Sequence, residues 1–354
     1  MAELGGVRLG EIAPMHRFEI GPLETYLRAG IEDFGEALEV RQFQGGASNP
    51  TFLLTTQTAD GPRRYVLRKK PPGALLSSAH QVDREHRLMS ALAGTGVPVP
   101  RMRLLCQDPA VIGTAFYVMD YLEGRVFRDA TLPGLEAVDR AAIYDELNAT
   151  LAKLHKVDFE AVGLGDYGRA GNYFERQIAR WTRQYRDAES EHIPAMEALI
   201  AELPARMPSD DSVSIAHGDY RLENVMFHPT EPKLIAVLDW ELSTIGHPLA
   251  DIAYNGFLWH SHSPGWGSLD GVDFAASGIP TEADYVAAYL ERVGRGPIDD
   301  WGFYLSFSIF RLASISQGVY RRVLAGNAAS DRPPGNGTPD LARQALALLH
   351  GEQA

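Results

Sequence analysis

The first third of the chain alternates apolar and polar residues in the way that β-strands do. Three such stretches cover 36–44, 51–58 and 63–70, the second being rich in β-branched and aromatic residues. The turn-forming sequences GGASNP and ADGP separate them. The pattern therefore predicts an antiparallel meander of three strands.

Apolar residues at helical spacing follow the meander. Those between 82 and 92 fall on one face of a predicted helix, and two further strands are expected within 97–106 and 114–122. We therefore expect residues 1–122 to form an N-terminal lobe, with a five-stranded antiparallel sheet and one helix.

After this predicted sheet, the apolar positions recur with the period of an α-helix. Long helical segments are predicted over 137–158, 172–203, 281–294 and 301–326. The fold class is therefore expected to be α+β, with a second, larger and mostly helical lobe over 123–354. Ligands commonly bind in the cleft between two such lobes.

Composition and net charge limit the kinds of binding partner and the cellular compartment that we expect. The chain has 354 residues, 45% hydrophobic and 22% charged, as is ordinary for a soluble globular protein. Its one cysteine, Cys106, excludes an internal disulfide framework. A net charge of −13 argues against nucleic-acid binding and against docking on anionic membranes. Because the sequence shows neither a secretory signal nor an apolar run of membrane-spanning length, the expected location is the cytoplasm.

Polar and charged residues are crowded in the sequence AHGDYRLENVMFHP, which begins at Ala216. Asp219 can accept a proton from a hydroxyl, and Asn224 offers a neutral oxygen ligand. A predicted buried strand then ends in the sequence VLDWE, where Asp239 offers a charged oxygen. Magnesium favours such sparse oxygen sets, since it takes further ligands from water and phosphate. A turn and a strand-end cap would account for either motif alone, but the two together favour phosphoryl transfer.

The sequences HGDYRLENVMFHP and VLDWE resemble the catalytic segments of the aminoglycoside-phosphotransferase-like kinases, which include choline kinase. The resemblance is closest to the kinase-like domains that precede acyl-CoA dehydrogenases in some larger proteins, and it covers nearly the whole chain. It implies the bilobal protein-kinase-like fold. It also implies phosphorylation of a small-molecule hydroxyl with ATP and Mg²⁺.

The resemblance implies a role for each residue that matches a family position. Asp219 is the expected catalytic base, and His217 is its expected structural support. Asn224 and Asp239 are the expected Mg²⁺ ligands. Asp251, in the sequence PLADIAY, is expected to brace the catalytic loop.

The resemblance also implies a nucleotide site in the N-terminal lobe. The turn GGASN would cover the phosphates, with Ser48 and Asn49 nearest to them. The sequence FYVMDYLEG resembles a hinge. Met119 would line the adenine pocket, and the backbone of Asp120 and Leu122 would meet the adenine edge.

The third strand departs from the family pattern. It reads YVLRKK, so Arg68 stands where the usual phosphate-binding lysine is expected, and Glu85 is its expected acidic partner. Arginine binds phosphate with a planar fork, unlike the point charge of lysine. Lys69 should point to the opposite face and Lys70 to the same face as Arg68. The alternative for both lysines is a solvated strand end.

Two features of the sequence indicate what kind of molecule would accept the phosphate: the short segment after Asp239, and a stripe of arginines. Few residues separate Asp239 from the next predicted helix, which disfavours a protein kinase. Arg176, Arg180 and Arg183 share one face of a predicted helix. They suit an anionic acceptor, such as a hydroxylated acyl-CoA or another acidic metabolite. The alternative is that the stripe faces water and pairs with neighbouring acids.

Two other functions stay open from the sequence. One is an aminoglycoside phosphotransferase, which the arginine stripe disfavours because aminoglycosides are polycations. The other is a catalytically silent nucleotide-binding pseudokinase or scaffold, for which Arg68 is the sequence support. The presence of Asp219, Asn224 and Asp239 together argues against the silent alternative.

Overall fold

The structure is a computed structural model. It describes residues 2–4, 7–44, 49–71, 81–262, 267–325 and 335–352, with the backbone alone described for residues 2–4 and 7. Contacts within the chain divide it into two compact units. Unit 1 comprises 1–127, 160–164 and 222–242, and unit 2 comprises 128–159, 165–221 and 243–354.

Unit 1 is built around a sheet. Its strands are β1 Ala2–Leu4, β2 Val7–Gly10, β3 Glu36–Phe43, β4 Thr51–Thr58, β5 Gly61–Lys69, β6 Met102–Cys106, β7 Phe116–Asp120, β9 Val225–Phe227 and β10 Leu234–Val237. Its helices are α1 Ile20–Gly30, α2 Val82–Leu92 and α3 Pro109–Ile112, with short 3-10 turns η1 Pro14–His16, η3 Leu222–Asn224 and η4 Trp240–Leu242.

The main sheet of unit 1 confirms the predicted meander and extends it. Over the residues that the structure describes, seven antiparallel strands follow the order β1-β2-β3-β4-β5-β7-β6. The α+β class is confirmed. The sheet has more than the predicted five strands because β2 pairs with β3 and β1 pairs with β2, and α1 and α3 add to the one predicted helix. β1, β2 and α3 are only three or four residues long, whereas α1 has 11 residues and was missed.

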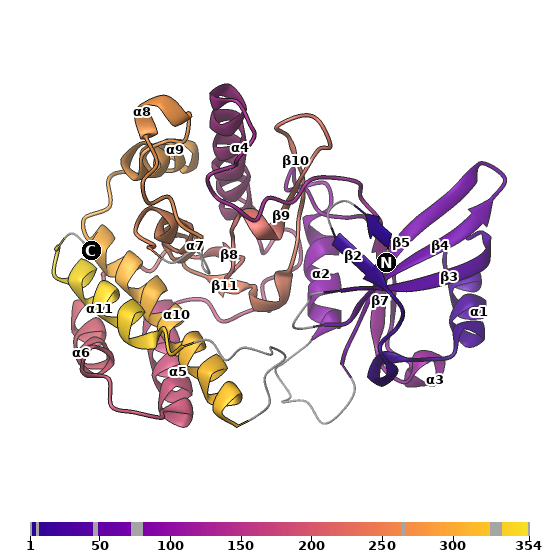
Figure 1. Cartoon of the computed structure of the whole chain (residues 1–354), viewed down its shortest axis with the longest axis horizontal. Coiled ribbons are helices and arrows are strands. Elements are labelled where there is room, and N and C mark those ends of the chain that lie inside the picture. The colour runs from indigo at the N-terminus through magenta and orange to yellow at the C-terminus, as the bar shows by residue number, and fades with distance from the viewer. Residues whose placement is uncertain are drawn as a thin grey trace. The chain divides into compact units, whose positions relative to one another are not determined.

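The two faces of this sheet have different surroundings, because side chains alternate along each strand. One face packs with α1 and α3 in an apolar core that includes Leu67, Phe116 and Val118. The next residues along the same strands, such as Val66 and Tyr117, point to the other face, where α2 lies (Figure 1). One face therefore supplies stability, and the other is available for a site.

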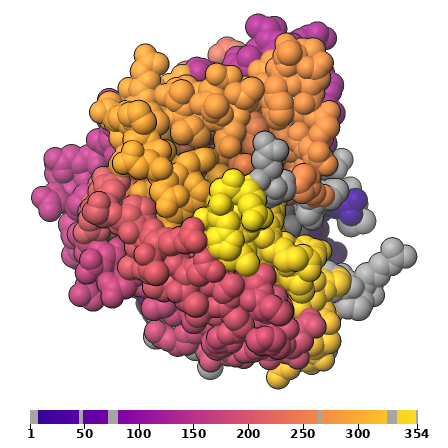
Figure 2. Space-filling view, turned by 90° about the vertical axis from the view of Figure 1, so that its left-hand side faces the viewer, coloured from indigo at the N-terminus to yellow at the C-terminus, as the bar shows by residue number. Residues whose placement is uncertain are grey.

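Unit 2 is mostly helical. Its elements are α4 Ala137–His155, α5 Tyr173–Ala188, α6 Pro194–Glu202, η2 Leu203–Arg206, β8 Ser214–Ala216, β11 Thr244–Gly246, α7 Pro248–Gly256, η5 Phe257–Trp259, α8 Phe274–Ser277, α9 Glu282–Val293, α10 Trp301–Leu324 and α11 Thr338–Leu349. The long helix α10 packs against α5, α7 and α11. In Figure 2 the yellow atoms of α11 lie beside the pink-red segment that contains α6, which α11 also contacts.

The predicted catalytic segment is shared between the units. Its first part follows β8, which pairs with β11 in unit 2. Its second part enters the hairpin of β9 and β10 in unit 1. No helix among the described residues is long and apolar enough to cross a membrane.

Candidate active site

A cavity of about 290 Å³ opens on the α2 side of the sheet in unit 1. Val66, Met119 and Leu122 contribute an apolar part of its lining. Its polar part includes Arg68, from β5, and Asn224 and Asp239, which flank the β9–β10 hairpin. Ligand sites commonly combine an apolar lining with a few polar groups in this way.

Arg68 holds three carboxylates together at one end of this cavity. Its Nη2 donates to Asp239 Oδ1 at 2.9 Å and lies 3.5 Å from Glu241 Oε2, and its Nε lies 3.4 Å from Glu85 Oε2. Burial alone would lower the pKa of the Arg68 guanidinium, but Tyr117, Glu85 and Asp239 outweigh it and raise the pKa above the ordinary value. Arg68 therefore remains charged, and its predicted partnership with Glu85 is present in the geometry.

Glu85 is a buried carboxylate, with only 2% of its surface exposed. It accepts hydrogen bonds from Asn49 Nδ2 at 2.9 Å and from the Tyr117 hydroxyl at 3.0 Å. Burial raises the pKa of Glu85, and the charge of Arg68 and these hydrogen bonds oppose that rise. The network fixes the position of Arg68 from behind, so that its fork is held toward the cavity.

The predicted hinge residues lie where a nucleotide base would be expected. Met119, Asp120 and Leu122 all line the cavity. The Asp120 side chain is engaged by Arg103, which donates to its two oxygens at 2.6 and 3.0 Å. This leaves the backbone of Asp120, rather than its carboxylate, for the predicted contact. Ser48 lies outside the described residues.

The lysines after Arg68 differ in their surroundings. The interpretation of Lys69 as part of a solvated strand end is wrong, because it is 4% exposed and its Nζ lies 5.3 Å from the centre of the Phe18 ring. Burial lowers the pKa of its amine. Lys70 is partly exposed and pairs with Asp83 at 3.5 Å. Alternation along β5 therefore places Lys69 on the face opposite Arg68, as predicted.

Asn224 and Asp239 form a donor set that suits Mg²⁺. Both line the cavity, and an amide oxygen and a carboxylate are hard oxygen ligands. The two segments are tied together because the Leu238 amide donates to the Asn224 carbonyl at 2.8 Å. Asp239 has a φ of +59°, a left-handed conformation that is rare outside glycine and that often marks functional sites.

In unit 2 the segment around His217 is held by a buried carboxylate. Asp251 on α7, 1% exposed, accepts from the His217 amide at 2.6 Å and from the Gly218 amide at 2.8 Å. His155 lies 3.3 Å from the same carboxylate. Burial would raise the pKa of Asp251, but the hydrogen bond and charge of His155 and the contacts from the segment lower it below the ordinary value. Asp251 therefore braces this segment in the geometry that the sequence predicts.

Asp219 follows the braced residues and is partly exposed. Its amide donates to His217 Nδ1 at 3.1 Å, so the His217 ring supports the turn. The Tyr254 hydroxyl donates to Asp219 Oδ1 at 2.5 Å, and Arg221 Nε lies 3.6 Å from the same oxygen. Burial and the charge of Asp219 raise the pKa of Tyr254, which keeps it a proton donor in this bond. The contacts to Oδ1 fix the orientation of the carboxylate.

The three arginines of the predicted stripe do not act as a group. The Arg176 guanidinium donates to the carbonyls of Gly171 and Arg169, so it is engaged by the backbone that precedes α5. Arg183 is exposed. Arg180 lies over the ring of Trp181, with its Cζ 5.2 Å from the ring centre. The structure brings Arg180 near Arg311 of α10, a residue that the sequence reasoning missed.

Four polar residues of these clusters were missed, and the sequence carries a signal for most of them. Tyr117 lies two positions before Met119 and so shares its strand face. Tyr254 follows Asp251 by three positions on one helix. Arg311 is a single charge inside the apolar sequence FYLSFSIFRLASIS. Glu241 follows Asp239 in VLDWE, where only the aspartate matched the family pattern.

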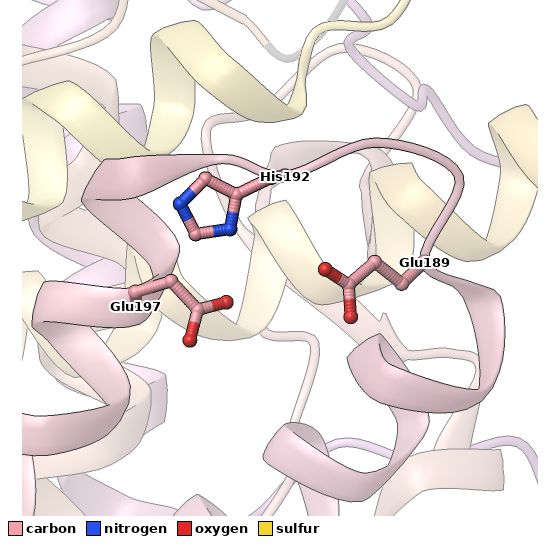
Figure 3. A group of neighbouring side chains, drawn as sticks. All are labelled: Glu189, His192 and Glu197. Carbon is pink, nitrogen blue, oxygen red and sulfur yellow. The ribbon is translucent and has the colours of Figure 1, made fainter.

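A separate group of possible metal ligands lies near the end of α5 and the start of α6. Figure 3 shows Glu189, His192 and Glu197, whose ligand atoms all lie within 4.8 Å of one another. Arg186 pairs with both carboxylates. This cluster is therefore an arginine-centred salt-bridge network at the surface.

The fold and the cavity agree with a class of small-molecule kinases, and comparisons with known proteins show the family. The fold is that of choline kinase and the aminoglycoside phosphotransferases: the Cryptosporidium parvum choline kinase structure has a TM-score of 0.60 at 13% identity, covering 94% of this chain and 95% of that one. Residues 39–295 match the model of the phosphotransferase enzyme family, APH. The chain therefore belongs to the phosphotransferase enzyme family.

More similar relatives refine this placement. A crystal structure of a Ralstonia eutropha protein, provisionally called an aminoglycoside phosphotransferase, is 47% identical with a TM-score of 0.87, covering 96% of this chain and all of that one. Acyl-CoA dehydrogenase family member 10 of Mus musculus is 47% identical over 87% of this chain and 29% of its own length. The predicted relationship to such proteins is confirmed. The chain spans less than half the length of the first acyl-CoA dehydrogenase family members that it matches.

Proposed function

We propose that the chain is an ATP- and Mg²⁺-dependent phosphotransferase that moves the γ-phosphate to a hydroxyl of a small molecule. The observation that carries the proposal is the cavity of unit 1, where Arg68, Asn224 and Asp239 meet an apolar lining. A metal–nucleotide complex requires a cation for its phosphates, oxygen ligands for its metal and an apolar slot for its base. Membership of the phosphotransferase enzyme family supports the same reaction class.

The proposed nucleotide contacts follow from the lining of the cavity. The adenine ring would lie against Val66, Met119 and Leu122, with the Asp120 carbonyl and the Leu122 amide meeting its polar edge. Arg68 would contact the phosphates, since three nearby carboxylates keep it charged and oriented. Hydrogen bonds to Glu85 would hold this arrangement during the reaction.

Asn224 and Asp239 would hold the magnesium ion. Bound Mg²⁺ neutralises charge on the nucleotide phosphates and helps to orient them. Asp239 Oδ1 accepts a hydrogen bond from Arg68, so Arg68 would shift from this carboxylate toward the phosphates when the metal complex binds. The partial exposure of Asp239 leaves room for this exchange of partners.

Asp219 would act as the general base. It would accept the proton of the acceptor hydroxyl as that oxygen bonds to the γ-phosphorus and the bond to the ADP oxygen breaks. Tyr254 and Arg221 contact Oδ1, which orients the carboxylate that would meet the hydroxyl. Asp219 and Asn224 are five positions apart in one loop, so a single segment supplies a base and a metal ligand.

The proposed acceptor is an acidic hydroxyl compound, with a hydroxylated acyl-CoA as one member of the class. Support comes from the positive charge of Arg180 and Arg311 in the unit that carries Asp219. The kinship with acyl-CoA dehydrogenase family members also favours acids of this kind. Polycationic aminoglycosides are disfavoured because like charges repel.

The direct test is the Asp219→Asn variant, assayed with a panel of hydroxylated acids, acyl-CoAs and aminoglycosides. We expect ATP-dependent transfer to an acid, with kcat reduced by about 1,000-fold in the variant, because general-base catalysis contributes roughly 100- to 10,000-fold. Asp187→Asn, at an exposed position of α5, is the matched control and should keep full activity. Persistence of transfer in Asp219→Asn would disprove the assigned base, and transfer to aminoglycosides alone would disprove the acceptor class.

A further inference from the structure

Two guanidinium groups meet around one indole ring in unit 2. Arg180 and Trp181 are neighbours on α5, and Arg311 comes from the middle of α10. The Cζ atoms of Arg180 and Arg311 lie 5.2 and 5.5 Å from the centre of the Trp181 ring. Contact with one flat aromatic ring restricts the conformational freedom of both cations.

Arg311 links this cluster to the residues around the base. It is 7% exposed, its Nη2 donates to the Gly218 carbonyl, and its Cζ lies 5.1 Å from the centre of the Tyr254 ring. Gly218 precedes Asp219, and the Tyr254 hydroxyl donates to Asp219. Arg311 therefore contacts both Gly218, which precedes Asp219, and Tyr254, which donates to Asp219.

Neither arginine has a carboxylate counter-ion in the part of the chain that the structure describes. Among the described residues, no carboxylate oxygen lies within 4.0 Å of a nitrogen of Arg180 or Arg311. Arg311 Nε is buried and has no hydrogen-bond partner. Burial and the charge of Arg311 lower the pKa of Arg180, although it stays far above neutral for a guanidinium. Buried donors and like charges without a counter-ion are unfavourable, and a bound anion would relieve both.

A neutral hydroxyl adds a further donor beside the arginines. Tyr173 begins α5 and is buried. Burial raises the pKa of Tyr173 to about 12, opposed by the charges of Arg311 and Arg180, so its hydroxyl keeps its proton at neutral pH. Two guanidinium groups with a hydroxyl donor match the oxygens of a carboxylate or a phosphate.

We propose that Arg180 and Arg311 form an oxyanion subsite beside Asp219, and that this subsite selects acceptors in which an anionic group lies a few bonds from the hydroxyl. The inference rests on the proposed phosphotransferase function and narrows its acceptor to a compact hydroxy acid. Of the three arginines of the α5 stripe, only Arg180 takes part, since Arg176 is engaged by carbonyls and Arg183 stands exposed.

The experiment compares ω-hydroxyalkanoates of three to six carbons with diols of the same length. Binding to the full chain is measured by calorimetry without ATP, and turnover is then measured with ATP and Mg²⁺. The variants are Arg180→Gln and, as the matched control on the same helix, Arg183→Gln. Arg180 is exposed, so its substitution leaves the core intact.

We expect at least one acid to bind the unaltered chain, and its diol to bind at least about 10-fold more weakly. Arg180→Gln should weaken binding of that acid by about 10- to 100-fold, as loss of a charge-assisted contact implies. Arg183→Gln should bind it normally. The KM for ATP should not change in either variant, and Arg180→Lys should recover part of the lost affinity.

The inference is overturned if no hydroxyalkanoate and no hydroxyacyl-CoA binds, if acids and diols bind alike, or if Arg183→Gln loses as much as Arg180→Gln. Arg180-dependent binding of hydroxyacyl-CoA thioesters alone would also overturn it, because the oxyanion would then be a phosphate of CoA, far from the hydroxyl. Failure of the phosphotransferase proposal looks different: the acids would bind with the same dependence on Arg180, but no acid would consume ATP.

Discussion

Each unit contains a buried arginine, and the two arginines have opposite surroundings. Arg68 in unit 1 faces three carboxylates, from Glu85, Asp239 and Glu241. Arg311 in unit 2 faces the Trp181 and Tyr254 rings and one backbone carbonyl. Both side chains are removed from water, so both have lost hydration. Among the described residues, only Arg68 is compensated by ion pairs with carboxylates.

The difference separates two uses of a buried cation. A cation that is already paired is held in place before its ligand arrives, and its pairing also stabilises the fold. A cation that lacks a counter-ion reduces stability until an anionic ligand binds. Arg68 fits the first description, and Arg311 fits the second. Substitutions that remove each charge should therefore affect stability unequally.

The largest expected effect comes from Arg68→Met. Removing this cation leaves Glu85 buried and unpaired, which should reduce the free energy of unfolding by about 3–5 kcal/mol. Arg311→Met removes an unpaired charge and one hydrogen bond, so the loss should be only about 1–2 kcal/mol. Urea unfolding followed by tryptophan fluorescence measures both.

The double variant Arg68→Met with Glu85→Gln is the control for this comparison. It removes the stranded charge, so it should regain at least half of the stability lost by Arg68→Met while remaining inactive. Equal losses in Arg68→Met and Arg311→Met would contradict the distinction between a paired and an unpaired arginine.

The fold was predictable where periodic patterns are long. Strand alternation in β3, β4 and β5 and the apolar spacing of α4 and α10 gave elements that the structure contains. The first two strands, β1 and β2, are three and four residues long and have too few positions to show a period. Their place in the sheet depends on pairing with β3, which is a tertiary contact and leaves little trace in local sequence.

The candidate site was predictable where chemistry and spacing coincide. Asp219, Asn224 and Asp239 carry that signal, and the structure places the last two on one cavity. Arg311 was missed because it is a single charge inside an apolar helix, and one residue has no spacing. Tyr254 was missed although it follows Asp251 by three positions on α7, because a tyrosine in an apolar helix usually indicates core packing. The surroundings of Lys69 were missed because the strand end RKK reads as solvated, while Phe18 comes from a distant segment.

A second prediction concerns pH and a buried histidine of unit 2, which, unlike the two arginines, can lose its charge. His247 is fully buried beside Asp210, at 3.0 Å, and burial lowers its pKa to about 4 despite that partner. Between pH 6.5 and 4 the unfolded chain therefore binds a proton that the folded chain does not. Stability rises with pH across this window, and lowering the pH from 7 to 4 should cost about 2–3 kcal/mol.

His247→Asn is the matched variant, because asparagine can also cap α7 but does not titrate. Between pH 7 and pH 4 the free energy of unfolding of the unaltered chain should fall by about 2–3 kcal/mol. That of the variant should fall by only a small part of this amount. Asp210 does not confuse the measurement: its pKa is lowered to about 2, so its contribution is lost only below about pH 4. Equal pH dependence in both chains would show that His247 is charged in the folded state.

The smallest effect is expected at a buried lysine. It tests whether a buried basic side chain that has no carboxylate partner among the described residues is enough to mark an anion-binding site. Lys69 is such a group, with its Nζ 5.3 and 6.0 Å from the Phe18 and Phe52 ring centres and its pKa lowered by burial. A lysine in this position can lose its proton, whereas arginine stays charged and so retains its need for an anion. Lys69→Met should therefore raise the free energy of unfolding by only about 0.5 kcal/mol, since removal of a desolvated amine slightly outweighs the lost cation–π contact. The rate of ATP-dependent transfer should change less than twofold in Lys69→Met, measured in the same assay as Arg68→Met. A comparable loss of activity in the two variants would make Lys69 the phosphate-binding cation in place of Arg68.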